Sequence, residues 1–402
     1  MATFDYTAKN KNGKVTHGTI EIGTRDDAVI SLENQGLTPV TITTNEKFSL
    51  SKIIDHYSII PLSEKVLFSQ ELATLVSAGV PISQSLAMLE KQTKNKRFKE
   101  TIAIITKDVE GGLPLSVAIE KHPLVFSPIF VSMVKSGEIG GTLDESLNRL
   151  ADQMVKDKAL ISKIRGAMIY PAVIFIGMVC AMIFMLVTIV PTLQDMFNEM
   201  GGELPFTTKS LIFLSDALTK YGVITLLVIV SVVIGYRYAL KHNYKFKYFI
   251  HSMVLKTPVV GSLTTKMNIA RFSRTLGSLL NSGVGIVESL QIIANSSQNI
   301  LFKEALEKSA EKVKNGSSIG ETFKNFEVIP LLVTQMISVG EETGSLDKIL
   351  NKVADFYDSE VENMSRNLTV LLEPLIMIFI GIMVGYLIIA IIGPIYAVTG
   401  MV

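Results

Sequence analysis

The sequence predicts a mainly α-helical, polytopic membrane protein with two repeated cytosolic six-helix bundles, three transmembrane helices and a small α/β N-terminal module. Three observations support this fold class. Long apolar segments interrupt a chain of 402 residues, of which only 19% are charged. A unit of about 100 residues occurs twice, and each copy ends in one of the apolar segments. The N-terminal segment instead shows the alternation of polar and apolar residues that is typical of strands.

The N-terminal module is predicted over residues 1–60. Apolar and polar residues alternate in residues 4–8, and the pair Asn12–Gly13 is typical of a hairpin turn. Thr24 is placed to cap a following helix, and residues 37–42 again have the composition of a strand. We therefore expect two strands, a helix and a third strand, followed by a linker or a short helix.

Three segments are candidates for transmembrane helices, because about 20 mostly apolar residues cross the hydrocarbon layer as a helix. Residues 167–190 carry no charge, and residues 368–393 carry one. The middle segment, residues 221–240, is uncharged over only 16 residues. It reaches the length of a span if Lys220 and Arg237 extend to the two interfaces, and the alternative is a buried helix of a soluble domain.

The charges of the connecting segments predict the orientation, since Lys and Arg gather on the cytoplasmic side. They are frequent before the first span and after the second, scarce between these two, and absent after the third. The N-terminus is therefore expected inside and the C-terminus outside. The remaining segments are a first cytosolic bundle, a short outer loop, a second cytosolic bundle and an outer C-terminal tail, at residues 61–166, 191–220, 241–367 and 394–402.

An internal repeat connects the two soluble regions. Residues 68–95 and 272–299 are identical at ten of 28 positions, whereas unrelated segments share about two. The match continues with an offset of 203 residues instead of 204. Within each copy the apolar residues recur at helical spacing, and Gly79 and Gly283 are placed to end a helix. Each copy is expected to form about six helices, the last of which leads to a span.

A glycine–glutamate motif lies within each copy and reads SGEIGG in the first and VGEETG in the second. We expect a helix that ends at Gly137 and another that begins at Thr142, where Thr142 and Glu145 have the spacing of a capping box. The motif either forms a structural turn or contacts a partner, and both interpretations are open. The candidate residues are Gly137, Glu138, Gly141, Gly340, Glu341 and Gly344.

Glu373 is the one acidic residue inside a predicted span. It either lies at the interface or pairs with Arg165 or Arg366, or it contacts a charge of another protein within the membrane. Pro171 and Pro374 occupy equivalent positions near the start of the first and third spans, and they predict matched helix kinks.

Several kinds of chemistry find no support in the sequence. The phosphate-binding motif G-x-x-x-x-G-K-[ST] is absent, and the five histidines lack the spacing of metal ligands. A net charge of +1 gives no general attraction for nucleic acid, and a single cysteine excludes an intrachain disulfide. We therefore predict no enzyme activity, cofactor or metal. The alternative function is a small secondary transporter, or another polytopic membrane protein that works as an oligomer.

The doubled unit, with L-x-x-L-x-x-x-G-V, a G-E motif, a basic helix and a proline-containing span, resembles a known family. This is the inner-membrane platform family of type IV pilus and type II secretion machines, the PilC and GspF type. The pattern F-x-Y-x-A…G-K…G-x-I-E…G-L-T-P in residues 4–39 is similar to that family's leading segment. The second copy has Val339 where the first has Ser136, so the sequence leaves open whether Glu138 and Glu341 have equal roles.

The resemblance implies a multi-pass protein of the bacterial inner (cytoplasmic) membrane that acts as a platform. It implies that the platform couples a cytosolic hexameric assembly ATPase to the extraction and polymerisation of pilin or pseudopilin subunits. Other expected partners are inner-membrane alignment proteins, membrane lipid and further copies of the same chain, with no direct contact to nucleic acid. Whether the machine builds pili, secretes proteins or takes up DNA stays open.

Overall fold

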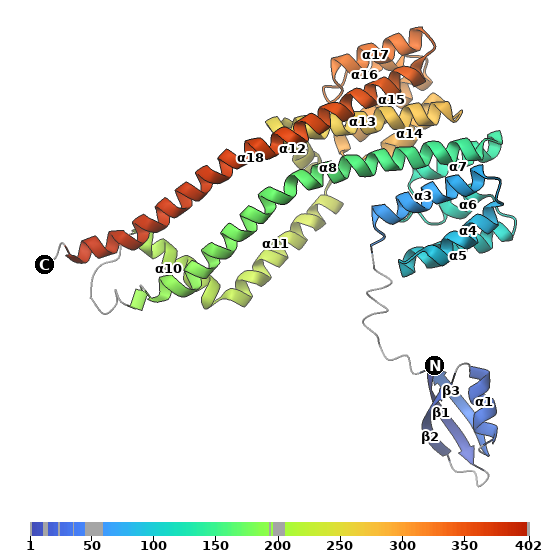
Figure 1. Cartoon of the computed structure of the whole chain (residues 1–402), viewed down its shortest axis with the longest axis horizontal. Coiled ribbons are helices and arrows are strands. Elements are labelled where there is room, and N and C mark those ends of the chain that lie inside the picture. Colours follow the sequence, from blue (N-terminus) through green and yellow to red (C-terminus); the bar gives the residue numbers. More distant parts are fainter. Residues whose placement is uncertain are drawn as a thin grey trace. The chain divides into compact units, whose positions relative to one another are not determined.

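The computed structural model describes residues 2–10, 15–22, 25–34, 36–44, 59–192, 194–195 and 206–399. Most of these residues are helical, and one small sheet lies near the N-terminus, as the sequence predicts (Figure 1). The chain divides into two compact units, one of Met1–Ile60 with Thr93–Thr101 and the other of Pro61–Gln92 with Ile102–Val402.

The N-terminal sheet has three antiparallel strands in the order β2-β1-β3, namely β1 (Ala2–Asn10), β2 (Val15–Ile22) and β3 (Leu37–Thr44). Helix α1 (Arg25–Asn34) connects β2 to β3, so the predicted order of strand, strand, helix and strand is confirmed. The expected turn at Asn12–Gly13, the cap at Thr24 and most of the linker, residues 45–58, lie outside the described residues.

Six helices lie between residues 62 and 184 and are called the first half here: α3 (Leu62–Ser77), α4 (Ile82–Gln92), α5 (Lys96–Glu110), α6 (Leu115–Glu120), α7 (Pro128–Gly140) and α8 (Leu143–Phe184). Gly79 lies just after α3, as predicted, and has φ of 81°. Glycine is favoured at this position because residues with a side chain rarely adopt the left-handed conformation that ends the helix. Apolar residues from several of these helices are fully buried, among them Leu72, Leu86, Ile119, Met133 and Leu147.

The same order of helices recurs in the second half: α13 (Pro258–Asn281), α14 (Ile286–Ser296), α15 (Ile300–Lys314), α16 (Ile319–Phe323), α17 (Leu331–Glu342) and α18 (Leu346–Thr399). Helices α4 and α14 both have 11 residues, and α5 and α15 both have 15. Gly283, with φ of 83°, follows α13 as Gly79 follows α3. A further helix, α12 (Tyr244–Lys256), precedes this half and packs on α13 and α15.

Three helical segments are long and apolar enough to cross a membrane by length and composition, namely Leu143–Thr192, Gly222–His242 and Leu346–Tyr386. The middle one is α11 (Gly222–His242). The other two contain α8 and most of α18, and each of these helices runs without interruption from its helical half into the apolar segment (Figure 1). Each helical half is therefore joined to its apolar segment by a single continuous helix.

The connection between α8 and α11 differs from the expected loop. A π-helix, η1 (Met185–Ile189), follows α8, and residues 206–219 form a helix, α10 (Phe206–Thr219). Leu211 of α10 packs in a buried cluster with Leu186 and Val190. This contact between distant segments stabilises α10, and the charge pattern of a loop does not reveal it. At the other end of the chain, residues 394–399, expected in a tail, belong to α18.

Candidate functional site

Helix α7 approaches the first turn of α8 closely because Gly137 has no side chain. A Cβ atom at Gly137 would lie 2.7 Å from the Cβ of Ser146 and 2.9 Å from the Cα of Leu143. Real Cβ atoms do not come this near to backbone atoms, so any larger residue would push the two helices apart. The first glycine of the motif therefore sets the distance between α7 and α8.

The second glycine that both copies of the motif share, Gly141 in the first copy, ends α7. It has φ of 68°, and its N–H bonds to the carbonyl of Gly137. The predicted end of this helix at Gly137 is wrong, because Gly137 serves helix packing and α7 continues to Gly140. The predicted capping box is also wrong: the side chain of Thr142 makes no capping hydrogen bond, and its ψ of 40° lies outside the extended conformation that a cap requires.

Glu138 binds the N-terminus of α6 through its carboxylate. Leu115 N–H donates to Oε1 at 2.5 Å, and Ser116 N–H donates to Oε2 at 3.0 Å. These two amides begin α6, where no earlier carbonyl of the helix can accept from them. The residue before the helix is Pro114, which makes no side-chain cap. Glu138 therefore supplies, from 23 residues further along the chain, the anionic cap that α6 lacks.

Glu341 makes the same contact in the second half. Ile319 N–H donates to Oε1 at 2.7 Å and Gly320 N–H to Oε2 at 2.8 Å, and both amides begin α16. The flanking glycines also correspond: a Cβ at Gly340 would lie 3.0 Å from the Cα of Leu346, and Gly344 has φ of 65°. The two motifs thus have one geometry, although their sequences differ between the glycines.

The two halves meet at Arg274 of α13, whose side chain is only 5% exposed. One guanidinium nitrogen lies 3.0 Å from the carboxylate of Asp157 on α8, and the other contacts Asp358 on α18. Burial raises the pKa of Asp157 above its ordinary value, and the nearby cations of Arg271 and Arg274 oppose this rise. One buried cation thus joins α8, α13 and α18.

The sequence did not predict this cluster. Its one signal in the sequence is that the second copy of the repeat has a charged residue, Arg274, where the first copy has an uncharged one. The counterpart of Arg274 in the first half is Gln70. Further contacts connect the halves: Lys156 with Asp355 at 3.2 Å, Lys163 with Glu362 at 2.6 Å, and the Gln153 amide, which donates to the Thr275 hydroxyl at 2.8 Å. Two of these are ion pairs directly between α8 and α18, so the two long helices are joined in the parts that precede their apolar segments.

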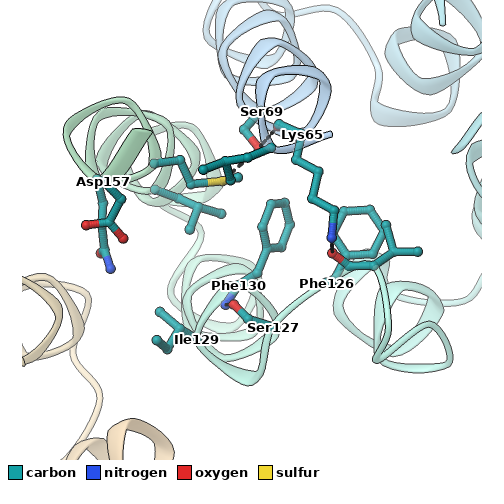
Figure 2. A pocket seen from close by; sticks show the side chains of 12 residues that line it. Lys65, Ser69, Phe126, Ser127, Ile129, Phe130 and Asp157 are labelled. Atoms are coloured by element: carbon teal, nitrogen blue, oxygen red, sulfur yellow. Dashed lines mark hydrogen bonds between the residues drawn. The ribbon is translucent and has the colours of Figure 1, made fainter. Parts of the chain in front are cut away.

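A pocket of about 230 Å³ lies between α3, α7 and α8 of the first half (Figure 2). The aromatic rings of Phe126 and Phe130 line it, and the ammonium group of Lys65 donates to the carbonyl of Val125 at 2.6 Å. Asp157 lies at its edge, so the carboxylate that binds Arg274 also borders this pocket. In the described part of the chain, no three His, Cys, Asp or Glu side chains are grouped to hold a metal ion.

The remaining predicted site residues lie on the long helices. Glu373 is exposed on α18, and Arg366, one of its expected partners, pairs instead with Glu362 at 2.8 Å. Pro171 and Pro374 lie inside α8 and α18, which continue past both residues. None of these residues lies in the two glycine–glutamate motifs, and the kinks and the role of Glu373 stay predictions.

Comparison with known proteins assigns the whole length of the chain to one family. The sequence model of "Type II secretion system (T2SS), protein F" matches twice, over residues 68–191 and 272–394. The model of the N-terminal domain of the same protein matches residues 1–43. The two matches to the first model cover the same two halves in which the helix order recurs.

Curated relatives agree over nearly their full length. The chain is 37% identical to the type IV pilus assembly protein PilC of Thermus thermophilus, with 100% of this chain and 99% of the relative covered. It is 33% identical to PilC of Myxococcus xanthus, covering 99% and 95%. It is 32% identical to the type II secretion system protein F of Xanthomonas campestris, covering 99% of both chains. The chain therefore belongs to the PilC and type II secretion protein F family, a family of structural platform proteins rather than enzymes.

Proposed function

We propose that this chain is the inner-membrane platform of a type IV pilus or type II secretion machine. The observation that carries the proposal is the family match over both halves and the N-terminal module, together with three helical segments that fit membrane spans. The platform couples a cytosolic assembly ATPase to the extraction and polymerisation of pilin or pseudopilin subunits. Alignment proteins of the inner membrane, lipid and further copies of the chain are its other partners.

The proposed topology has two helical halves in the cytosol as bundles, at residues 61–166 and 241–367. The distribution of Lys and Arg supports it, since these residues are frequent before the first apolar segment and after the second, and only Lys209 and Lys220 lie between them. The N-terminus is then cytosolic, and residues 191–220 and the C-terminus lie outside. Because the sequence has no phosphate-binding loop motif, the energy for assembly comes from the docked ATPase.

Movement reaches the membrane through α8 and α18. Each is one continuous helix from a soluble half into an apolar segment, and the pair of Lys156 and Asp355 connects the two. In a Cys180→Ser background, Lys156→Cys with Asp355→Cys locks these helices together by a disulfide. We expect the lock to abolish assembly and a reductant to restore it, with the complex intact in both states. Normal pilus or secretion output from the oxidised protein would refute this transmission.

Glu373 is proposed to meet the positively charged N-terminus of an incoming pilin within the membrane. It is exposed on the apolar part of α18, where an unpaired carboxylate is costly. We expect Glu373→Gln to block assembly at an unchanged level of membrane-inserted protein. Normal assembly by this variant would exclude the contact.

Affinity purification from crosslinked native membranes, followed by mass spectrometry, tests the platform itself. We expect a hexameric-type ATPase and pilin-like subunits among the recovered proteins, and the identity of the pilin decides between pilus and secretion. Recovery of the chain alone at good yield would contradict the proposal.

A further inference from the structure

A polar cavity of about 270 Å³ lies between α8, α13 and α18, where the two halves meet. Helix α8 lines it with residues 149, 152, 153 and 156, which have the spacing of one helix face. Helix α13 lines it with residues 274, 278 and 281, and α18 contributes Asn351. Every residue of this lining is polar or charged. Faces on which helices pack are normally apolar, so packing alone does not account for this composition.

Cations outnumber carboxylates in the lining of this cavity. Among the described residues, Arg149, Lys156 and Arg274 line it, and Asp152 is the one carboxylate beside them. The carboxylates that pair with the three cations lie outside the lining, namely Glu145, Asp355, Asp157 and Asp358. The side chains of Arg149 and Lys156 are 38% and 53% exposed, and each has more N–H donors than its one ion pair uses. The lining therefore suits an anion.

Two buried side chains of the lining have polar atoms without partners. Arg274 is 4% exposed and Gln153 is 6% exposed. Among the described residues, neither the Nε–H of Arg274 nor the Oε1 atom of Gln153 has a hydrogen-bond partner. Reversing the Gln153 amide leaves its NH₂ group unpaired instead, because the other amide atom stays on the Thr275 hydroxyl. Unpaired buried polar groups are rare in folded proteins, and they mark places that a ligand, an ion or water fills.

The repeated architecture does not require this composition. At an offset of 203, Gln153 and Lys156 correspond to Phe356 and Ser359 in the second half. At an offset of 204, Arg274 corresponds to the uncharged Gln70 in the first half. The cations and the unpaired amide therefore belong to this one junction of α8, α13 and α18, and they are not a general feature of the two halves.

We propose that this cavity binds a small dissolved organic phosphate, with its phosphate group held by Arg149 and Lys156 next to the buried cation of Arg274. Phosphate has several acceptor oxygens, which suit guanidinium and ammonium donors that come from different helices. Asp152 accepts from a hydroxyl or amino group of the organic part, and its charge disfavours a bare polyanion. An occupant contacts both halves, so its binding stabilises their joined state.

The position of the cavity favours a dissolved ligand over a phospholipid headgroup. Under the proposed topology the membrane begins near Ala167. Lys156, the residue of α8 in the lining that is nearest to this segment, precedes it by eleven residues, or roughly 16 Å of helix. A headgroup at the membrane surface lies too far from Arg149, which is two helical turns further away.

Calorimetric titration of the full chain, in a non-ionic detergent without phosphate and at constant ionic strength, tests this site. The probes are adenosine monophosphate and pyrophosphate, and adenosine is the control that lacks a phosphate group. We expect both probes to bind and adenosine not to bind. Arg149→Gln and Lys156→Gln should each weaken the binding of adenosine monophosphate about tenfold, because each removes a charge-assisted hydrogen bond.

Lys303→Gln is the matched control for these two variants. The side chain of Lys303 is 40% exposed, pairs with Glu307 four residues along its helix, and lies outside the cavity. Its removal should leave the affinity for both probes unchanged. An equal loss of affinity in Lys303→Gln would show that only the general charge of the protein attracts the probes, and it would overturn the proposal.

Asp152→Asn provides a second variant whose expected effect is a gain, which loss of folding cannot produce. Without this carboxylate, pyrophosphate should bind about fivefold more tightly, because one negative charge beside the anion is removed. Unchanged or weaker pyrophosphate binding by this variant would contradict the site. So would the absence of binding by both phosphate probes, or equal binding of adenosine and adenosine monophosphate.

A last comparison separates the dissolved ligand from a lipid. The affinity for adenosine monophosphate should be equal in nanodiscs of phosphatidylcholine and of phosphatidylglycerol. Loss of binding in phosphatidylglycerol alone would show that an anionic headgroup occupies the cavity, and it would overturn the proposal. The measurements need no ATPase or pilin, so their failure leaves the proposed platform function standing, and failure of partner recovery leaves this site standing.

Discussion

Glu138 and Glu341 bind the same feature of the two halves: each carboxylate accepts two hydrogen bonds from the first amides of the short helix that precedes its own. The sequence between the flanking glycines differs, yet the distances agree within a few tenths of an ångström. The geometry favours the structural role of the motif, because the carboxylates point into their own halves. The motif fixes three helices against one another by one glycine contact and one capping carboxylate.

The first prediction concerns these capping carboxylates. Glu138→Ala and Glu341→Ala should each lower the free energy of unfolding by about 2 kcal/mol, since two amides lose a charged acceptor. Glu→Gln should cost less, because the amide oxygen still accepts. Thermal unfolding of the detergent-solubilised protein measures both. The neighbouring exposed Glu342 is the matched control, and an equal loss for Glu342→Ala would show that the effect is one of general charge.

The second prediction concerns the glycine contact. Gly137→Ala should destabilise the protein by about 1–3 kcal/mol, because the new methyl group overlaps Ser146 and Leu143. Gly340→Ala should cost less, since its nearest atom is 3.0 Å away. Gly140→Ala is the control in the same helix, where a Cβ lies 3.4 Å from the Thr142 hydroxyl oxygen. Unfolding curves for the three variants give the order, and a tolerated Gly137→Ala would mean that α7 and α8 separate freely.

Local signals predicted much of this fold. Alternation identified the strands, and helical periodicity with Gly79 and Gly283 identified the helices and their ends. The repeat placed the two glutamates at equivalent positions. It could not identify their role, because the amides that Glu138 accepts from lie 22 and 23 residues earlier in the sequence.

Contacts between distant helices stayed hidden for the same reason. Arg274 has no charged counterpart in the repeat, and its partners on α8 and α18 are 117 and 84 residues away. Helix α10 packs against the π-helix, and no residue pattern in the sequence predicts this contact. The sequence therefore predicts which segments are helical, and the tertiary contacts decide which of their polar groups matter.

The third prediction concerns the buried cluster. Arg274→Met should lower stability by about 3–5 kcal/mol, because two carboxylates remain without their common cation. Hydrogen exchange should rise in α13 and in the part of α8 that precedes its apolar segment, where the halves meet. Lys156→Met removes a more exposed ion pair and should cost at most about 1 kcal/mol. Equal effects of the two substitutions would refute the special role of Arg274.

The fourth prediction concerns His251 of α12, which accepts a hydrogen bond at Nδ1 from the N–H of Ile300, the first residue of α15. Burial, together with the charge of Lys247, lowers the pKa of His251 below its ordinary value of 6.5. The neutral ring is thus favoured in the folded state, so its contribution is complete above pH 6.5 and is lost as the pH falls through the lowered pKa. Protonation also removes the acceptor.

Acidification from about pH 7.5 to 5 should therefore destabilise the wild-type protein more than His251→Asn, whose amide oxygen accepts without titrating in this range. The difference between the two unfolding temperatures should shrink or reverse towards low pH. His242→Asn, at an exposed histidine, is the control and should follow the wild-type curve. Parallel curves for wild type and His251→Asn would show that the neutral His251 ring does not stabilise the start of α15, because only a titrating acceptor makes the two curves converge.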